Sequence, residues 1–216
     1  GPGGSAFGYA FSNADGDDGG PLTDYDIIGS AAAGTGFFAL RAAEDFNLLC
    51  IPPLAREHDV GLSALLVAAR YCRERHSMLI VDPPASWATP RTALEAMRSW
   101  PFRSDNAVMY YPRIQTLDRL RGRVETFGPC GAVAGMLARS DDICPLWSAV
   151  ESEEMTLRPG VQPAVAVCDA DCLRLAQVGI NTLREPHASV PGAGGLRVDA
   201  RTLAAGGSGF ADWEYL

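Results

Sequence analysis

The fold is decided by three short apolar runs: Phe46-Asn-Leu-Leu-Cys-Ile-Pro-Pro53, Met78-Leu-Ile-Val-Asp-Pro-Pro84 and Ala107-Val-Met-Tyr-Tyr-Pro112. Each run ends at proline, which has no N–H to donate to a sheet, so each predicts a buried strand that stops there. The two intervening stretches, about 59–75 and 89–100, carry apolar residues at helical spacing. Strands that alternate with helices predict a parallel sheet.

Local signals place the expected helices between and after these strands. Asp59 is expected to cap the first helix, and Thr89-Pro90 the second, with proline in its first turn. A third helix of small residues is expected over residues 129–139, where Gly131 and Gly135 would allow close approach to the sheet. We therefore predict an α/β domain over residues 22–142, in which helices flank a mostly parallel sheet in three layers.

The flanking segments have a different composition. Residues 1–5 have the look of a cloning scar, and residues 6–21, rich in Gly, Asp, Asn and Ser, are typical of a flexible arm or loop. Residues 143–216 predict a small α+β C-terminal subdomain. It would contain a short helix capped by Asp169 or Asp171, followed by strands near 179–184 and 195–198.

Composition excludes several classes of protein. The 216 residues are 47% hydrophobic and 20% charged, which is typical of a globular protein. A net charge of −8 repels the phosphate backbone, so nucleic acid is not expected as a partner. No apolar run approaches the ~18 residues of a membrane span, so no membrane insertion is expected.

The cysteines do not predict a metal or a disulfide framework. The six cysteines show no paired spacing beyond Cys168-Asp-Ala-Asp-Cys172, which has no second pair and no adjacent histidine to complete a zinc site. They are expected to be reduced thiols. No metal and no cofactor is predicted.

Two motifs allow a catalytic interpretation. Gly34-Thr-Gly-Phe-Phe-Ala39 has the spacing of a dinucleotide fingerprint but lacks a preceding strand, so a small-residue loop is the better interpretation. Asp82 ends a central strand, where α/β enzymes place catalytic groups. The alternatives are a hydrolase-like enzyme that uses Asp82 with His58 or His76, and a turn whose carboxylate accepts backbone N–H groups.

Two charged clusters are candidate contact surfaces. One is basic and lies in a turn-like stretch: Arg113, Arg119, Arg121 and Arg123. The other is acidic: Glu151, Glu153 and Glu154. Each cluster is either a solvated surface or one half of a complementary contact between copies of the chain.

A series of segments in fixed order resembles one family. Besides the three apolar runs, with Trp87 after the second, the segments are Pro129-Cys-Gly-Ala-Val-Ala-Gly-Met-Leu-Ala-Arg-Ser-Asp141, Trp147, Gly179-Ile-Asn-Thr-Leu-Arg184, Arg197-Val198, Ala200-Arg-Thr-Leu203 and Asp212-Trp-Glu-Tyr215. Together they resemble the tail sheath protein of contractile phage tails and contractile injection systems, over roughly residues 15–216. The chain departs from the family before Ala200, where the family often carries Trp-Gly.

This resemblance implies a structural protein, not an enzyme. It implies a subtilisin-like α/β fold without a protease site. The subunit would polymerise with other sheath subunits in a helical array around an inner tube on a baseplate, and contraction would drive the tube through a target envelope. The location would be a virion tail, or a phage-tail-like particle such as one from a prophage, assembled in the bacterial cytoplasm.

The resemblance also adds candidate contact residues. Family members join neighbours through terminal arms that add strands to a small sheet, which makes Ile180, Arg184 and Arg197 candidates. The chain stops where such an arm would continue. We therefore expect a core that does not polymerise alone and has an unpaired strand edge near residues 180–184 or 196–198.

Overall fold

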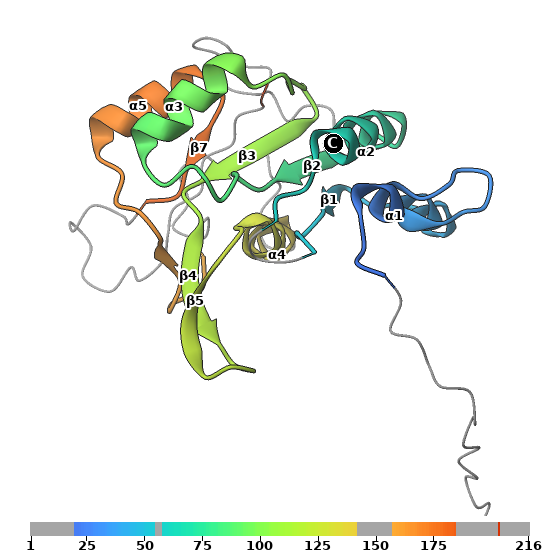
Figure 1. Cartoon of the computed structure of the whole chain (residues 1–216), viewed down its shortest axis with the longest axis horizontal. Coiled ribbons are helices and arrows are strands. Elements are labelled where there is room, and N and C mark those ends of the chain that lie inside the picture. The colour runs from blue at the N-terminus through green and yellow to red at the C-terminus, as the bar shows by residue number, and fades with distance from the viewer. Residues whose placement is uncertain (1–19, 55–57, 142–156, 185–202, 204–216) are drawn as a thin grey trace, which may run out of the picture.

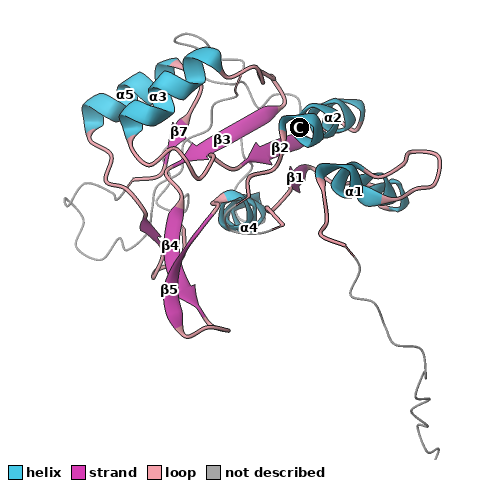
Figure 2. Cartoon of the chain, in the orientation of Figure 1, coloured by secondary structure: helices cyan, strands magenta, loops and turns pink. Residues whose placement is uncertain are grey.

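A parallel sheet forms the centre of the molecule. The computed structural model describes residues 20–54, 58–141, 157–184 and 203. Strands β1 (Leu48–Cys50), β2 (Met78–Val81), β3 (Ala107–Tyr111) and β7 (Asn181–Thr182) lie in the order β1-β2-β3-β7, and every neighbouring pair is parallel (Figures 1 and 2). The predicted α/β class with a mostly parallel sheet is confirmed.

Helices cover both faces of this sheet. Alternate strand residues point to opposite faces, so Leu79 and Met109 belong to one apolar cluster and Ile80 and Val108 to another. The first cluster contains residues of α2 (Leu62–Glu74), α3 (Pro90–Ser99) and α5 (Asp169–Gln177). The second contains residues of α4 (Cys130–Asp141). The central strands are therefore buried on both sides, as their continuous apolar runs predict.

Helix α2 begins differently from the prediction. Its N-cap is Gly61, whose N–H donates to Asp24 Oδ1 at 3.1 Å. Asp59 lies two residues before this cap, too early to serve it, and instead accepts the N–H of Ala85 at 2.9 Å. The predicted Asp59 cap is therefore wrong, and this carboxylate holds the loop after β2.

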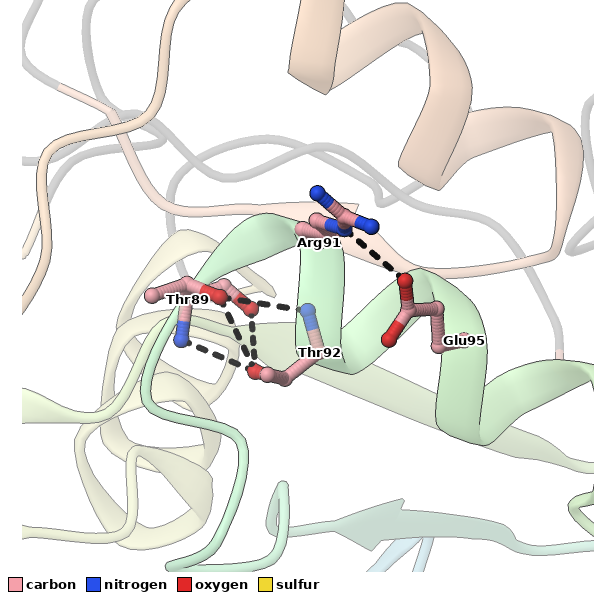
Figure 3. Close-up of polar contacts among 4 residues, drawn as sticks. All are labelled: Thr89, Arg91, Thr92 and Glu95. Carbon is pink, nitrogen blue, oxygen red and sulfur yellow. Dashed lines mark hydrogen bonds and ion pairs between the residues drawn. The ribbon is translucent and has the colours of Figure 1, made fainter.

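Helix α3 begins as predicted. Thr89 is its N-cap, Pro90 follows in the first turn, and Thr89 and Thr92 exchange two side-chain to backbone hydrogen bonds of 3.0 and 3.2 Å (Figure 3). These bonds satisfy N–H groups that a helix start leaves without partners. In the same first turn, Arg91 donates at 2.9 Å to Glu95, one turn further along the exposed side (Figure 3).

The basic stretch forms a β-hairpin rather than a turn-like loop. Strands β4 (Ile114–Asp118) and β5 (Arg123–Phe127) are antiparallel, and β6 (Gln162–Pro163) pairs with β4. The Asp118 carboxylate accepts the N–H groups of Leu120 and Arg121, and Gly122 takes a φ of 66° that closes the turn. Figure 1 shows this hairpin extending away from the parallel sheet.

Helix α5 and strand β7, near the C-terminal end of the described chain, belong to the main α/β core. Helix α5 packs beside α3, and β7 pairs with β3 through Tyr110↔Asn181 and Tyr111↔Thr182 (Figure 1). Residues 169–182 therefore extend the α/β core, and the strand expected near 179–184 is present as β7. Its expected partner at 195–198 lies outside the described residues, as do residues 1–19.

The N-terminal described segment packs against α2. Helix α1 (Asp24–Ile28) and the 3₁₀ helix η1 (Gly36–Ala42) precede β1, so the glycine pattern at 34–39 follows no strand of the sheet. Phe37 is buried, with its ring centre 5.6 Å from that of Tyr71. A core role thus accounts for this motif. Within the described ranges, no helix has the length and apolar character needed to cross a membrane.

Candidate functional site

The carboxyl ends of β1, β2 and β3 meet at one edge of the sheet, which we call the carboxyl edge. Parallel strands place these ends together, and α/β proteins bind ligands there. A cavity of about 560 Å³ opens at this edge. Its walls include Cys50, Asp82, Arg113, Arg121, Phe127 and Cys130.

Asp82 holds the beginning of α4. Its Oδ1 accepts the N–H of Cys130 at 2.7 Å, so the carboxylate caps a helix that follows it by 48 residues. Burial raises the pKa of Asp82, against the lowering effect of the hydrogen bond from the Cys130 backbone N–H and the charge of Arg113. Of the two interpretations of Asp82, the structure supports the one in which the carboxylate accepts a backbone N–H.

The histidines do not complete a hydrolase site with Asp82. His76 precedes β2 whereas Asp82 follows it, which separates them by roughly 20 Å of extended chain. His58 is exposed, and no hydrogen bond among the described residues joins Asp82 to either histidine. The described ranges also contain no group of three or more residues able to hold a metal ion.

Arg113 is an internal residue rather than a surface contact. Its guanidinium lies 3.4 Å from Asp59 Oδ1, and its Nε donates to the carbonyl of Pro83 at 3.2 Å. The side chain is only 12% exposed. Arg113 therefore fixes the loop after β2, and its side chain offers little surface to a neighbouring subunit.

Two thiols meet inside the cavity. Cys50 ends β1 and is partly exposed, while Cys130 begins α4 and is buried. Their side chains are hydrogen-bonded, and this bond lowers the pKa of the Cys50 thiol. The same bond, burial and the nearby Asp82 carboxylate raise the pKa of Cys130, which keeps its proton and acts as the donor. Sequence spacing carries no signal for this pair, because only the packing of α4 on β1 joins the two residues.

The β4–β5 hairpin exposes apolar side chains. Leu117 and Val124 lie directly opposite each other and are 56% and 65% exposed. Leu120, in the turn, is 98% exposed. We call these three residues the hairpin patch. Scattered exposed leucines are ordinary, but an exposed cross-strand pair next to an exposed turn leucine is a candidate contact surface.

Arginines border the hairpin patch. Arg121 and Arg123 both form ion pairs with Glu125 of the same hairpin, the first at 3.9 Å. Arg119 is exposed in the turn. The predicted basic cluster is thus brought together on one hairpin, apart from the inward-facing Arg113. The acidic residues Glu151, Glu153 and Glu154 lie outside the described residues.

The two described C-terminal candidate contact residues, Ile180 and Arg184, lie in different environments. Ile180 is fully buried in the core, so its side chain is not available for a subunit contact. Arg184 lies 3.4 Å from Asp169 and is 31% exposed. Arg197 lies outside the described residues. In the described part of the sheet, β7 is an edge strand with β3 as its neighbour.

Comparison with known proteins supports the fold. No protein-family model and no curated protein matches the chain. The chain is similar to a solved structure of the PVC sheath complex of an extracellular contractile injection system in its contracted state. The TM-score is 0.56 at 21% identity, and the match covers 76% of this chain and 42% of that one.

A second match is to the baseplate of the anti-feeding prophage (AFP), with a TM-score of 0.48 at 18% identity, over 76% of this chain and 40% of that one. The chain thus spans less than half the length of either solved chain. The first likeness confirms the sheath-like structure predicted from the motifs at the level of fold.

Proposed function

We propose that this protein is a structural subunit of a contractile sheath. The observation that carries the proposal is the fold, which matches a sheath chain over 76% of this chain at a TM-score of 0.56. The ordered sequence motifs point to the same family. In this role the chain forms the core of a larger subunit. The whole subunit polymerises with its copies around an inner tube, joins a baseplate, and contracts to drive the tube through a target envelope.

The particle would be a phage tail or a phage-tail-like injection system, assembled in the bacterial cytoplasm. The part of the subunit beyond this core, including any arm that adds a strand to a neighbour, would account for the remaining length of the sheath chain. Arg184, which follows β7, stays a proposed contact residue for such a strand.

The hairpin patch is the proposed contact between subunits. Full burial of an aliphatic side chain contributes about 1.5–3 kcal/mol, so Leu117, Leu120 and Val124 can supply a useful share of a contact between copies. Arg119 at the rim favours an acidic counterpart. The acidic segment Glu151, Glu153 and Glu154 is the proposed counterpart in the neighbouring copy.

Purification of tail-like particles from cells that express the gene with its chromosomal neighbours tests the proposal. The chain should sediment with the particles, and electron microscopy should place it in the layer around the tube. Particles that assemble without the chain would contradict the sheath function.

Two variants test the hairpin patch separately. Leu117→Asp and Val124→Asp should fold normally, because both positions are exposed, but should be lost from the particles. Leu173→Asp is the matched control, since Leu173 is 69% exposed on α5. If each hairpin variant is incorporated into particles as well as the wild-type chain is, the contact is refuted while the sheath function stays in place.

A further inference from the structure

The paired thiols of Cys50 and Cys130 have no part in the proposed sheath function. They come from two neighbouring elements that line the cavity: Cys50 from the end of a strand, Cys130 from the first turn of the helix packed on that strand. Cys72, by contrast, is a residue of α2 and is fully buried in the core. Only the Cys50–Cys130 pair combines thiol contact with a cavity, among the described cysteines.

We propose that Cys50 and Cys130 form a thiol–disulfide exchange site. Cys50, at the cavity wall, is the attacking thiol, and the buried Cys130 is the resolving thiol that closes an intramolecular disulfide. The cavity of about 560 Å³ admits a small-molecule disulfide. Arg113 and Arg121 also line the cavity but pair with Asp59 and Glu125, so cavity size rather than charge selects the disulfide, and glutathione disulfide serves as the probe.

The exchange balances in two steps. The Cys50 thiolate attacks one sulfur of the small-molecule disulfide, a mixed disulfide forms, and one small-molecule thiol leaves with the proton that Cys50 lost. Cys130 then attacks the Cys50 sulfur and expels the second small-molecule thiol, which takes the Cys130 proton. Two protein thiols are oxidised to one disulfide, and one small-molecule disulfide is reduced to two thiols.

The hydrogen bond between the thiols sets the order of attack. The thiolate is the reactive form, and the bond donated by Cys130 favours the thiolate at Cys50. Burial and Asp82 keep Cys130 protonated until the mixed disulfide forms beside it. The resulting bond would tie the end of β1 to the start of α4, next to the base of the β4–β5 hairpin.

Incubation of the purified chain with glutathione disulfide, followed by non-reducing peptide mapping, tests the site. The wild-type chain should give a peptide that joins Cys50 to Cys130. Cys130→Ser should instead keep glutathione on Cys50, and Cys50→Ser should lose both products. Cys172→Ser, which removes a cysteine one helical turn from Cys168, should leave the Cys50–Cys130 product unchanged.

Several results would overturn the proposal. They are a wild-type chain without the joined peptide, a Cys50 that stays unmodified in Cys130→Ser, or a joined peptide that forms as readily in urea as in the folded chain. Circular dichroism of each variant before the reaction identifies any variant that fails to fold. If a variant fails to fold, the yield of the joined peptide from the wild-type chain with and without urea decides whether the folded site is required.

Discussion

Gly128 lies between β5 and α4, against the carboxylate of Asp82. A Cβ added at residue 128 would lie 2.0 Å from Asp82 Oδ2 and 2.3 Å from its Cγ, both far inside van der Waals contact. In Gly128→Ala the carboxylate must therefore move. Its movement breaks the hydrogen bond that Oδ1 accepts from the N–H of Cys130 at 2.7 Å.

The size of the effect follows from this single bond. A hydrogen bond to a charged group contributes about 1.5–3 kcal/mol, and alanine recovers about 0.4–1 kcal/mol by reducing the entropy of the unfolded chain. Gly128→Ala should therefore lower the free energy of unfolding by about 1–2 kcal/mol. For a chain of this size, that corresponds to a drop in Tm of roughly 2–8 °C.

Urea unfolding followed by tryptophan fluorescence measures the change. Gly135→Ala is the matched control, because a Cβ on this α4 residue meets nothing within 4 Å. Alanine there should stabilise the helix by about 0.5–1 kcal/mol. The reasoning fails if Gly128→Ala unfolds at the same urea concentration as Gly135→Ala. It also fails if Gly128→Ala costs as much in an Asp82→Ala background, where no carboxylate remains to displace.

Two further predictions concern the helix starts. Thr89→Ala should lower the free energy of unfolding by about 1 kcal/mol, because it removes the N-cap of α3. Thr89→Ser should retain most of that stability, and Arg91→Ala, at an exposed ion pair, should leave it nearly unchanged in the same urea titration. Asp82→Asn should alter the pH dependence of the free energy of unfolding. Burial raises the pKa of Asp82 in the folded chain, so its ionised form opposes folding at neutral pH, and this opposition disappears as the pH falls toward the ordinary value of 3.8. The free energy of unfolding of the wild-type chain, relative to that of Asp82→Asn, should therefore rise as the pH is lowered toward 3.8, and a fall over that range would contradict the assigned direction.

The central strands could be predicted because their signals are local. Apolar runs that end at proline predict β2 and β3 almost to the residue, and Thr89-Pro90 predicts the start of α3. The place of β7 could not be predicted in this way. It is a two-residue strand whose partner is β3, and nothing in its own residues specifies that pairing.

The β4–β5 hairpin differs from the turn-like stretch expected from the sequence, although the sequence contains a signal for it. Asp118 followed four residues later by Gly122 is the chemistry of a tight hairpin turn, but the arginines between them suggested an irregular charged loop. The expectation that Gly131 and Gly135 let α4 approach the sheet closely is also wrong. Both are exposed, and a Cβ at either meets nothing within 4 Å, so they do not bring α4 closer to the sheet.

The charges near the sheet explain why the carboxyl edge and the hairpin suit different roles. At the carboxyl edge, Arg113 binds Asp59 and the carbonyl of Pro83, and Asp82 binds the start of α4. A group held in this way costs free energy to release, because it would leave a buried partner unpaired. These groups therefore stabilise the loops and are poorly suited to bind a partner subunit. On the hairpin, strand pairing has already fixed the backbone of the exposed apolar pair Leu117 and Val124. A partner that covers this pair gains apolar burial, and only the side chains lose further conformational freedom. This difference makes the hairpin patch, and not the carboxyl edge, the surface on which the proposed assembly should depend.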